Sequence, residues 1–486
     1  MKRVRWKAVR PLRHRDYRLL WIGLAVALLG SGLWLVALAW QVIELGGGPV
    51  QLSVVTTAYS SGLLVCVLFG GIAADRLSQR SVMIAADSVR GVVLLLLAAL
   101  ALTGSLEIWH LAVGAVLIGA GEAFLIPAYT ALVPKLLPAE ELLAANGLEG
   151  TLRPLAQQAT GPALGGLAIA ALSPGVAILV AGLTYLFSAA CVMAMNVRPE
   201  TATAATTVAI GDEAAAGETA AAAQGATGEP AAGGEVTGVR AMVADLREAW
   251  GYVRTTPWLL ASLLFGTFYV LLILGPLEVL LPFAVRDQLG GGPGDFGLVL
   301  AAFGIGGALG ALLISSRKLP RRYLTIMTLM WGIGSAPIVV LGFAKDLWVM
   351  AAGAAVVGAT GSAAMVIWGT LLQRRVPDHL RGRIASLDFF VSLLLMPVSM
   401  ALAGPAGSLF GVTAVFIVAG VGPVLICFVV VWFGRMLTDE ITNPLDATHD
   451  ETDPAQDDSV QDDPAQDVPV QDETGEGASK RISSDA

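Results

Sequence analysis

Long apolar runs recur along the chain at a spacing that predicts a protein with many membrane-spanning helices. A hydrocarbon core about 30 Å thick requires about 20 apolar residues in a helix, and the sequence offers that length twelve times. The predicted spans cover residues 17–40, 52–74, 82–103, 108–131, 147–171 and 175–196, then 258–284, 294–315, 323–343, 347–370, 384–409 and 412–435. The chain is therefore expected to be an all-α membrane protein, with twelve transmembrane helices in two pseudo-symmetric six-helix halves.

Polar segments divide this pattern. Residues 199–237 consist mostly of Ala, Gly, Thr and Glu, a composition that predicts a flexible linker. Residues 238–255 place apolar side chains at helical spacing, which predicts an amphipathic helix along the membrane surface or under the helix bundle. The expected domains are an N-terminal half (1–198), a cytoplasmic linker with this helix (199–257), a C-terminal half (258–436) and a disordered, acidic cytoplasmic tail (437–486).

Charge is scarce and unevenly placed. Of the 486 residues, 55% are hydrophobic and 14% are charged, against roughly 25% charged in an average soluble domain. The net charge of −8 belongs to the tail: residues 437–486 hold 15 acidic and 2 basic residues, whereas the preceding residues hold 23 acidic and 28 basic ones. A body this apolar excludes a nucleic-acid-binding protein.

The basic residues also predict the orientation in the membrane. Short loops on the cytoplasmic side of membrane proteins carry an excess of Lys and Arg, and with a cytoplasmic N-terminus the outer loops hold only Arg286 and Lys345. We therefore expect both termini in the cytoplasm and a location in the cell membrane. Arginine outnumbers lysine 24 to 6, and Ala and Gly abound, which suggests a GC-rich bacterial genome.

The sequence offers no pattern for catalysis or metal binding. Cys66, Cys191 and Cys427 lie in separate apolar runs without a CxxC or His-rich partner, and the four histidines lie near span ends, in loops or in the tail. These positions favour packed core cysteines over a disulfide framework or a zinc site. No nucleotide-binding loop or nucleophile elbow is present, so we expect neither an enzyme nor an ATP-driven pump, and no cofactor or metal.

The loop after the second predicted span carries a recognisable motif, Gly71-Ile-Ala-Ala-Asp75-Arg76-Leu-Ser-Gln-Arg80. It is similar to the signature loop of the major facilitator superfamily, although Ser78 replaces the usual second glycine and Gln79 replaces a basic residue. The resemblance implies that superfamily's fold, in which two halves rock around a central site. Asp75 at the end of a span can accept hydrogen bonds from a helix start in the other half, while Arg76 or Arg80 bridges to a neighbouring acid. Gly71, Asp75, Arg76 and Arg80 are therefore the expected latch of the cytoplasmic gate.

A second motif, Gly161-Pro162-Ala-Leu-Gly165-Gly166, lies in the fifth span. Together with Leu142-Leu-Ala-Ala-Asn146-Gly147 it resembles the branch of the superfamily that contains macrolide-efflux proteins and the enterobactin exporter, among the drug:proton antiporters. The glycines form small helix faces and the proline interrupts the backbone ladder, which suits a bent or closely packed helix.

Ionisable residues inside the membrane cost at least about 2.5 kcal/mol on insertion scales and suggest function. Glu122, near the middle of the fourth span with no basic residue a turn away, is the expected proton-coupling or cation-recognising carboxylate. Glu278, near the outer end of the seventh span, is a second proton-coupling candidate or a surface acid. Asp87 and Arg90 lie three residues apart on the third span, where they form either a structural pair near the cytoplasmic side or part of a gate. Arg153 in the fifth span is a further gating candidate.

The resemblance also implies that spans one, four, seven and ten line the cavity. Aromatic rings in such a cavity bind flat, amphiphilic and often cationic molecules. The substrate contacts expected on this basis are Trp34, Phe124, Phe268, Tyr269 and Trp368.

These features together predict a secondary active transporter that exports an amphiphilic small molecule (a drug, secondary metabolite or siderophore) in exchange for protons, by alternating access. The expected partners are the substrate, protons and the lipid bilayer, and the expected state is a monomer. Two alternatives stay open: a proton symporter or facilitator for nutrient uptake, and a membrane receptor or scaffold that acts through the acidic tail.

Overall fold

The computed structural model describes residues 9–196, 247–248, 250–317 and 319–445. For residues 68–76 and for seven positions between 378 and 393 it describes the backbone only. Within these ranges the chain forms helices and no strand. The predicted linker 199–237 and most of the predicted acidic tail lie outside the described residues.

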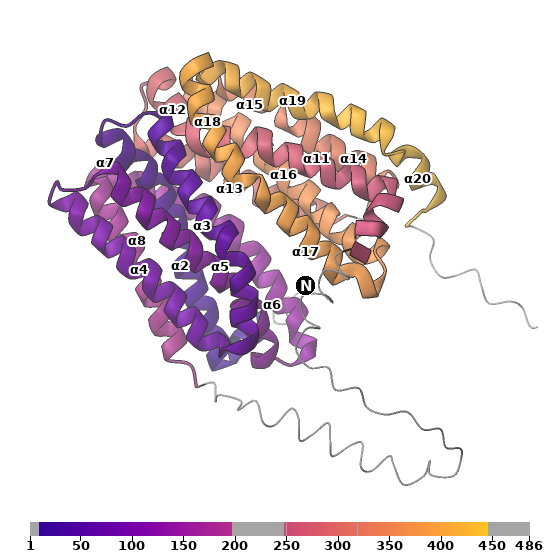
Figure 1. Ribbon diagram of the computed structural model, residues 1–486, viewed down its shortest axis with the longest axis horizontal. Helices are drawn as coiled ribbons and strands as arrows, with labels where there is room; N and C mark the ends of the chain where they lie inside the picture. Colours follow the sequence, from indigo (N-terminus) through magenta and orange to yellow (C-terminus); the bar gives the residue numbers. More distant parts are fainter. Residues whose placement is uncertain (1–8, 197–246, 249, 318, 446–486) are drawn as a thin grey trace, which may run out of the picture. The chain divides into compact units, whose positions relative to one another are not determined.

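The N-terminal half consists of long helices joined by short loops (Figure 1). Its elements are η1 (Arg10–Arg13), α2 (Arg15–Glu44), α3 (Pro49–Arg76), α4 (Gln79–Leu102), α5 (Ile108–Leu136), α6 (Ala139–Leu152), η2 (Arg153–Thr160), α7 (Gly161–Ala171) and α8 (Pro174–Met193).

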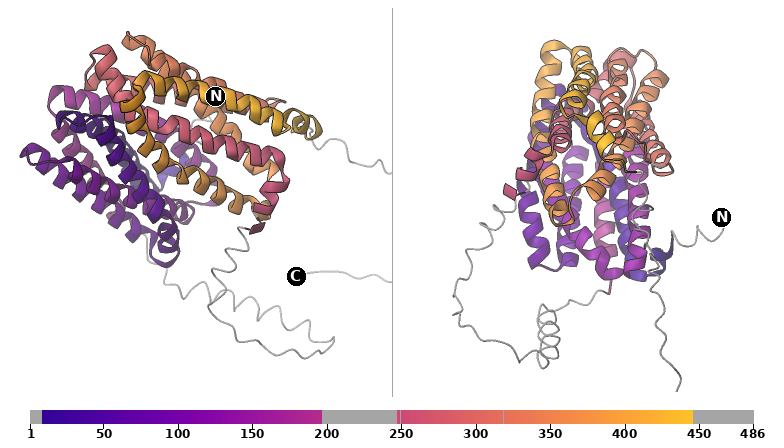
Figure 2. Two further views of the ribbon diagram at one scale, coloured as in Figure 1. Left: turned by 45° about the horizontal axis from the view of Figure 1, so that its top comes forward. Right: turned by 90° about the vertical axis from the view of Figure 1, so that its right-hand side faces the viewer.

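The C-terminal half repeats this plan with more interruptions (Figures 1 and 2). Its elements are α11 (Pro257–Gly275), η3 (Pro276–Leu280), α12 (Leu281–Leu289), α13 (Pro293–Ser315), α14 (Tyr323–Gly332), η4 (Ile333–Ser335), α15 (Pro337–Leu341), α16 (Leu347–Arg375), α17 (Asp378–Leu394), α18 (Met396–Phe410), α19 (Val412–Phe433) and α20 (Met436–Thr442).

Eleven helices in the described part of the chain are long and apolar enough to cross a membrane. The one predicted span that is not among these eleven helices is the fifth, 147–171. It corresponds to the helical run α6–η2–α7, which begins earlier than expected, at Ala139. A π-helical stretch at Arg153–Thr160 divides this run and carries Gln157 and Gln158. The fold is therefore the all-α, twelve-span architecture that the hydropathy pattern predicts.

Within each half, small residues let helix backbones approach closely. In the C-terminal half, α13 packs along α16, and side chains at Gly306 or Gly310 would collide with the carbonyl oxygens of Ala355 and Ala359. Such small-residue faces are a common way to pack helices in lipid, where no hydrophobic effect drives helices together.

The two halves meet through α3 against α18, and through η2 and α7 against α13. Ser53 of α3 donates a hydrogen bond to the carbonyl oxygen of Met400 (2.5 Å). Gly297 of α13 lies against α7 so closely that a Cβ there would lie 2.5 Å from the carbonyl oxygen of Pro162. The Ser53 and Gly297 contacts lie at the end of the bundle where α3 and α13 begin.

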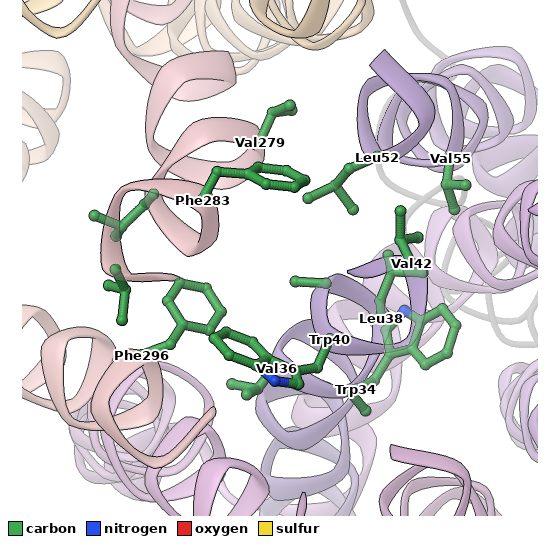
Figure 3. Close-up of a cluster of buried hydrophobic side chains, with 14 of the residues drawn as sticks. Trp34, Val36, Leu38, Trp40, Val42, Leu52, Val55, Val279, Phe283 and Phe296 are labelled. Carbon is green, nitrogen blue, oxygen red and sulfur yellow. The ribbon is translucent and has the colours of Figure 1, made fainter. Parts of the chain in front are cut away.

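An apolar cluster fills the space between the halves at the same end (Figure 3). Trp40 of α2 stacks on Phe296 of α13, with ring centroids 6.0 Å apart. Leu52 of α3 and Phe283 of α12 extend the cluster, and both side chains are buried. Because close backbone contacts and a buried apolar cluster coincide, the bundle is closed at this end.

One prediction about the tail is wrong in its first residues. The segment from residue 437 was expected to be disordered because it is acidic, but α20 is helical to Thr442. Asp439 forms an ion pair with Arg375, and Glu440 accepts hydrogen bonds from the Thr325 backbone nitrogen (2.6 Å) and hydroxyl (2.9 Å). Burial raises the pKa of the Glu440 carboxyl, and the bonds from Thr325 oppose that rise. Two acidic residues that bond to the C-terminal half therefore hold the first residues of the predicted tail in a helix.

The predicted amphipathic helix 238–255 is described only in its last part. Residues 247, 248 and 250–255 are helical, and Glu248 forms an ion pair with Arg383 (2.5 Å). The remaining positions of that prediction lie outside the described residues.

A valine at position 297 is expected to prevent closure of the bundle at the α3–α13 end, because its side chain would overlap the α7 backbone. Labelling of a Ser53→Cys reporter with maleimide, in a background without the native cysteines, measures this opening, since Ser53 is only 2% exposed. Gly297→Val should raise the labelling rate several-fold. Gly294→Val is the matched control, because a Cβ at Gly294 meets nothing within 4 Å. Equal rates in the two variants would contradict the prediction.

Candidate functional site

A cavity of about 480 Å³ lies between the two halves, and both contribute to its wall. The N-terminal half lines it with residues of α2, α3, α4, α5, η2, α7 and α8, and the C-terminal half with residues of α11, η3, α12, α13, α15, α16 and α18. Most lining side chains are apolar. The charged residues in the wall are Arg90, Glu122 and Glu278.

Arg90 is the centre of a buried charge network on the N-terminal half. Its Nη2 lies 3.2 Å from Glu122 Oε2 and donates to the Tyr185 hydroxyl at 2.7 Å. Its Nη1 lies 3.6 Å from Asp87 Oδ1, and its guanidinium lies over the Tyr185 ring, 4.0 Å from the centroid. Tyr59 donates its hydroxyl proton to Glu122 Oε2 (2.8 Å). Side chains of four helices, α3, α4, α5 and α8, therefore meet in one network around Arg90.

The network holds one cation against two carboxylates. Fully ionised, Asp87, Arg90 and Glu122 carry a net charge of −1 in a site from which water is largely excluded, and such an imbalance is costly. A single proton on either carboxylate removes it. The Asp87 side chain is 1% exposed and its Oδ2 accepts a hydrogen bond from Ser188 (2.7 Å), whereas the Glu122 side chain is 16% exposed and faces the cavity. Of these two carboxylates, Glu122 is therefore the one that is open to the cavity.

Small residues on α5 make room for the Arg90 side chain. A Cβ at Gly121 would lie 2.7 Å from Arg90 Cγ and 2.8 Å from its Cδ. The glycine beside Glu122 thus lets the arginine stem pass from α4 to the acid. Sequence reasoning missed this partner because it considered basic residues on the same helix only. The signal was a mid-helix arginine on α4 together with a glycine next to an intramembrane acid.

Asp87 and Arg90 form the predicted pair, but Arg90 also contacts side chains of other helices, which the sequence did not predict. Arg90 lies at the middle of α4, not near either end of the helix, and it lines the cavity. The pair therefore belongs to the same network as Glu122. One-dimensional spacing indicates which residues share a helix face, but not which neighbouring helix that face meets.

Glu278 faces the cavity from the opposite half. It lies on the π-helical segment η3, which begins directly after Gly275. The Gly275 nitrogen donates to Ser399 Oγ (2.8 Å), and Ser399 in turn donates to the carbonyl oxygen of Leu271 (2.7 Å). Glu278 has no hydrogen bond or ion pair to another side chain within the described residues. It lines the cavity, which distinguishes it from an acid on the outer surface.

The predicted latch is described in part. Gly71, Asp75 and Arg76 lie at the end of α3, where the structure describes the backbone only. Arg80 donates to the carbonyl oxygens of Val192 (3.1 Å) and Met193 (2.5 Å) at the end of α8. These contacts lie within the N-terminal half.

The remaining predicted gating residue and helix motif lie in the fifth span. Arg153 pairs with Glu149 one helical turn earlier (3.5 Å). Gly161, Pro162, Gly165 and Gly166 lie on α7, against α2 and α13. The motif thus lies at the contact between the halves.

Of the five aromatic residues expected in the cavity, Trp34 lines it and the other four are not among its lining residues. Phe124 packs against an apolar cluster of the N-terminal half, and Phe268 is 46% exposed. Tyr269 packs against the Trp331 ring (6.1 Å), and the Trp368 indole donates to Asp388 (2.9 Å). The aromatic positions that line the cavity without having been expected are Tyr59, Tyr185, Phe296 and Phe303.

The described residues contain no group of three or more His, Cys, Asp or Glu side chains that could hold a metal ion. Cys66, Cys191 and Cys427 are free thiols.

Twelve helical spans in two halves around a central cavity define a multi-pass membrane transporter. Solved structures of the same fold include a POT family transporter in complex with 5-aminolevulinic acid (TM-score 0.62, 13% identity, covering 86% of this chain and 96% of that one). The nucleoside transporter NupG is similar too (TM-score 0.57, 10% identity, covering 86% and 99%).

The sequence comparisons give the family. Residues 7–216 match the family model described as Transmembrane secretion effector, and residues 277–458 match the one described as Major Facilitator Superfamily. The chain belongs to the major facilitator superfamily.

Among its curated relatives are efflux proteins of bacteria. The multidrug efflux pump Tap of Mycolicibacterium fortuitum is 28% identical over 419 residues, which cover 84% of this chain and 93% of Tap. Macrolide efflux protein A of Streptococcus pyogenes is 24% identical over 417 residues, which cover 85% of this chain and 94% of the relative.

Proposed function

We propose that this protein is a secondary active transporter that exports amphiphilic small molecules (drugs, secondary metabolites or siderophores) in exchange for protons. The observation that carries the proposal is the buried Arg90, shared by Asp87 and Glu122 at the wall of an apolar cavity. The efflux activity named for Tap and for macrolide efflux protein A supports the direction of transport. An apolar wall with a few fixed polar groups suits an amphiphilic ligand.

The proposed mechanism is alternating access of the cavity. In this scheme both termini lie in the cytoplasm and the closed α3–α13 end faces outward, and we assign the arrangement of the helices to an inward-facing state. In the outward-facing state, protonation of Glu122 weakens its attraction to Arg90, lowers substrate affinity and favours the return to the inward-facing state. Asp75 and Arg76 then help to close the cytoplasmic gate. One proton at the network is sufficient for this cycle.

Reconstitution into proteoliposomes tests the proposal. The purified protein is assayed for transport of ethidium, erythromycin and a catecholate siderophore, with and without an imposed pH gradient. At least one compound should be transported against its concentration gradient, only when the gradient is present. Accumulation of none of them, or transport that ignores the pH gradient, would contradict the proposal. Uptake of a nutrient in the same direction as protons would favour the symporter alternative.

Trp34 is expected to contribute to substrate binding, because its ring is part of the cavity wall on α2. Trp34→Ala should weaken binding of the transported compound several-fold, measured by equilibrium dialysis on protein in nanodiscs. Phe268→Ala removes an aromatic ring that is exposed outside the cavity wall, so it is the matched control and should leave the affinity unchanged. A larger loss in the Phe268 variant would show that the cavity described here is not the binding site.

A further inference from the structure

Two carboxylates face the cavity, and they differ in their partners. Glu122 Oε2 is held by Arg90 at 3.2 Å and by the Tyr59 hydroxyl at 2.8 Å. Glu278 lies on the other half and has no hydrogen bond or ion pair among the described side chains. Arg90, the basic residue of the cavity wall, already has two carboxylates within 3.6 Å. The charge on Glu278 is therefore left for something that enters the cavity.

The surroundings of Glu278 make an uncompensated charge expensive. Leu274, Leu277 and Leu281 of the same helical run line the cavity around it, and Phe296 of α13 belongs to the same wall. An ionised carboxylate among apolar groups needs a counter-charge or a proton. A ligand whose positive charge sits beside apolar groups satisfies the acid and the surrounding wall together.

The backbone around Glu278 is held in place. Pro276 opens the π-helical turn and Pro282 follows it, so two backbone donors are missing from this stretch. Ser399 of α18 bridges the break by bonding both Gly275 and Leu271. Single-turn π-helical segments within helices are frequent at functional sites. Glu278 lies in this segment, and it lines the cavity.

We propose that Glu278 recognises the positive charge of the substrate, and that the substrates are lipophilic cations. The inference rests on the proposed transport function. It assigns proton binding to one half and recognition of the substrate to the other. The Asp87–Arg90–Glu122 network of the N-terminal half carries the proton. Glu278 of the C-terminal half selects the ligand. Glu278 adds a negative charge to the cavity whether or not the network carries its proton, so the cavity attracts a monovalent cation and disfavours an anion. The attraction is strongest when the network is deprotonated, as exchange for a proton requires.

Binding to purified protein in nanodiscs tests this assignment with two related aryl-phosphorus probes, which have four and three phenyl rings. Tetraphenylphosphonium carries a permanent positive charge, and triphenylphosphine oxide is neutral. Glu278→Gln should weaken tetraphenylphosphonium binding at least about tenfold and leave triphenylphosphine oxide binding unchanged. Glu278→Asp, which keeps the charge on a shorter side chain, should restore part of the affinity for the cation.

Asp287→Asn is the matched control. It removes one acidic charge from the same helical run, but from an exposed position where Arg286 is its partner, and it should bind both probes as the unchanged protein does. Size-exclusion chromatography of each variant identifies any loss of folding. The charge-keeping Asp variant provides the test if the Gln variant does not fold.

Three results would overturn the inference. Equal binding of tetraphenylphosphonium to the Gln variant and the unchanged protein would remove the cation contact. Equal loss of both probes would indicate a structural role for Glu278. Unchanged cation binding with loss of the response to a pH gradient would make Glu278 a proton site instead. Failure of the proposed transport function is distinguishable, because the unchanged protein would then bind the cation but transport none of the compounds against a gradient.

Discussion

Replacing Arg90 with leucine is expected to destabilise the protein by about 3–5 kcal/mol, the range measured when one partner of a buried ion pair is removed. The variant leaves Asp87 and Glu122 without their cation, and the Tyr185 hydroxyl loses its hydrogen-bond donor. The free energy of unfolding in mixed detergent micelles measures the effect. Arg153→Leu is the control, because its pair with Glu149 is partly exposed and such pairs contribute about 0–1 kcal/mol.

A rescue experiment separates charge from packing. If the loss in Arg90→Leu arises from two uncompensated carboxylates, adding Asp87→Asn and Glu122→Gln should restore a large part of the stability. The neutral amides keep the shapes of the acids and remove their charges. No recovery in the triple variant would mean that the arginine stem, which packs on Gly121, matters more than its charge.

Replacing Glu122 with glutamine is expected to abolish the response of transport to a pH gradient. The amide cannot bind and release a proton, and it still accepts the hydrogen bond from Tyr59 through its oxygen. Transport driven by the pH gradient should fall to the level of the gradient-free assay. Exchange of substrate down its own concentration gradient should persist, because the cavity keeps its shape, but with a lower substrate affinity, because the neutral amide resembles the protonated acid. The two assays are run on the same proteoliposomes.

Glu149→Gln serves as the control for this experiment. Glu149 is an acid of the N-terminal half that pairs with Arg153 and is not among the residues that line the cavity. That variant should keep gradient-driven transport. If Glu122→Gln keeps it as well, the proton is carried elsewhere and the proposed role of Glu122 fails.

Much of the fold could be predicted from the sequence, because lipid imposes a simple rule. Backbone polar groups must bond within their own segment in a membrane, so each long apolar run becomes a helix. The one span outside the eleven long apolar helices, 147–171, is the one that carries Arg153, Gln157 and Gln158 and is divided by a π-helical stretch. The acidic composition after residue 437 predicted disorder, but two acids with partners on the C-terminal half order α20.

The candidate site could be predicted only as a set of separate residues. Ionisable side chains are costly to place in a membrane, so their positions in apolar runs indicated Glu122, Glu278, Asp87 and Arg90 as candidates. The family resemblance predicted five aromatic substrate contacts, because they lie on the spans that line the cavity in that family. The structure places only Trp34 in the cavity wall, because a helix number does not determine which face of the helix meets the cavity.

The sequence by itself determined which segments cross the membrane and which of their residues are too polar to lie there without a reason, since both depend on local composition. The tertiary structure alone decided the partners: that Arg90 of α4 reaches Glu122 of α5 past Gly121, and that Glu278 faces the same cavity from the other half without a hydrogen-bond or ion-pair partner among the residues that the structure describes. The physical reason is that electrostatic interactions act through a few ångströms of space, whereas the sequence records only distance along the chain.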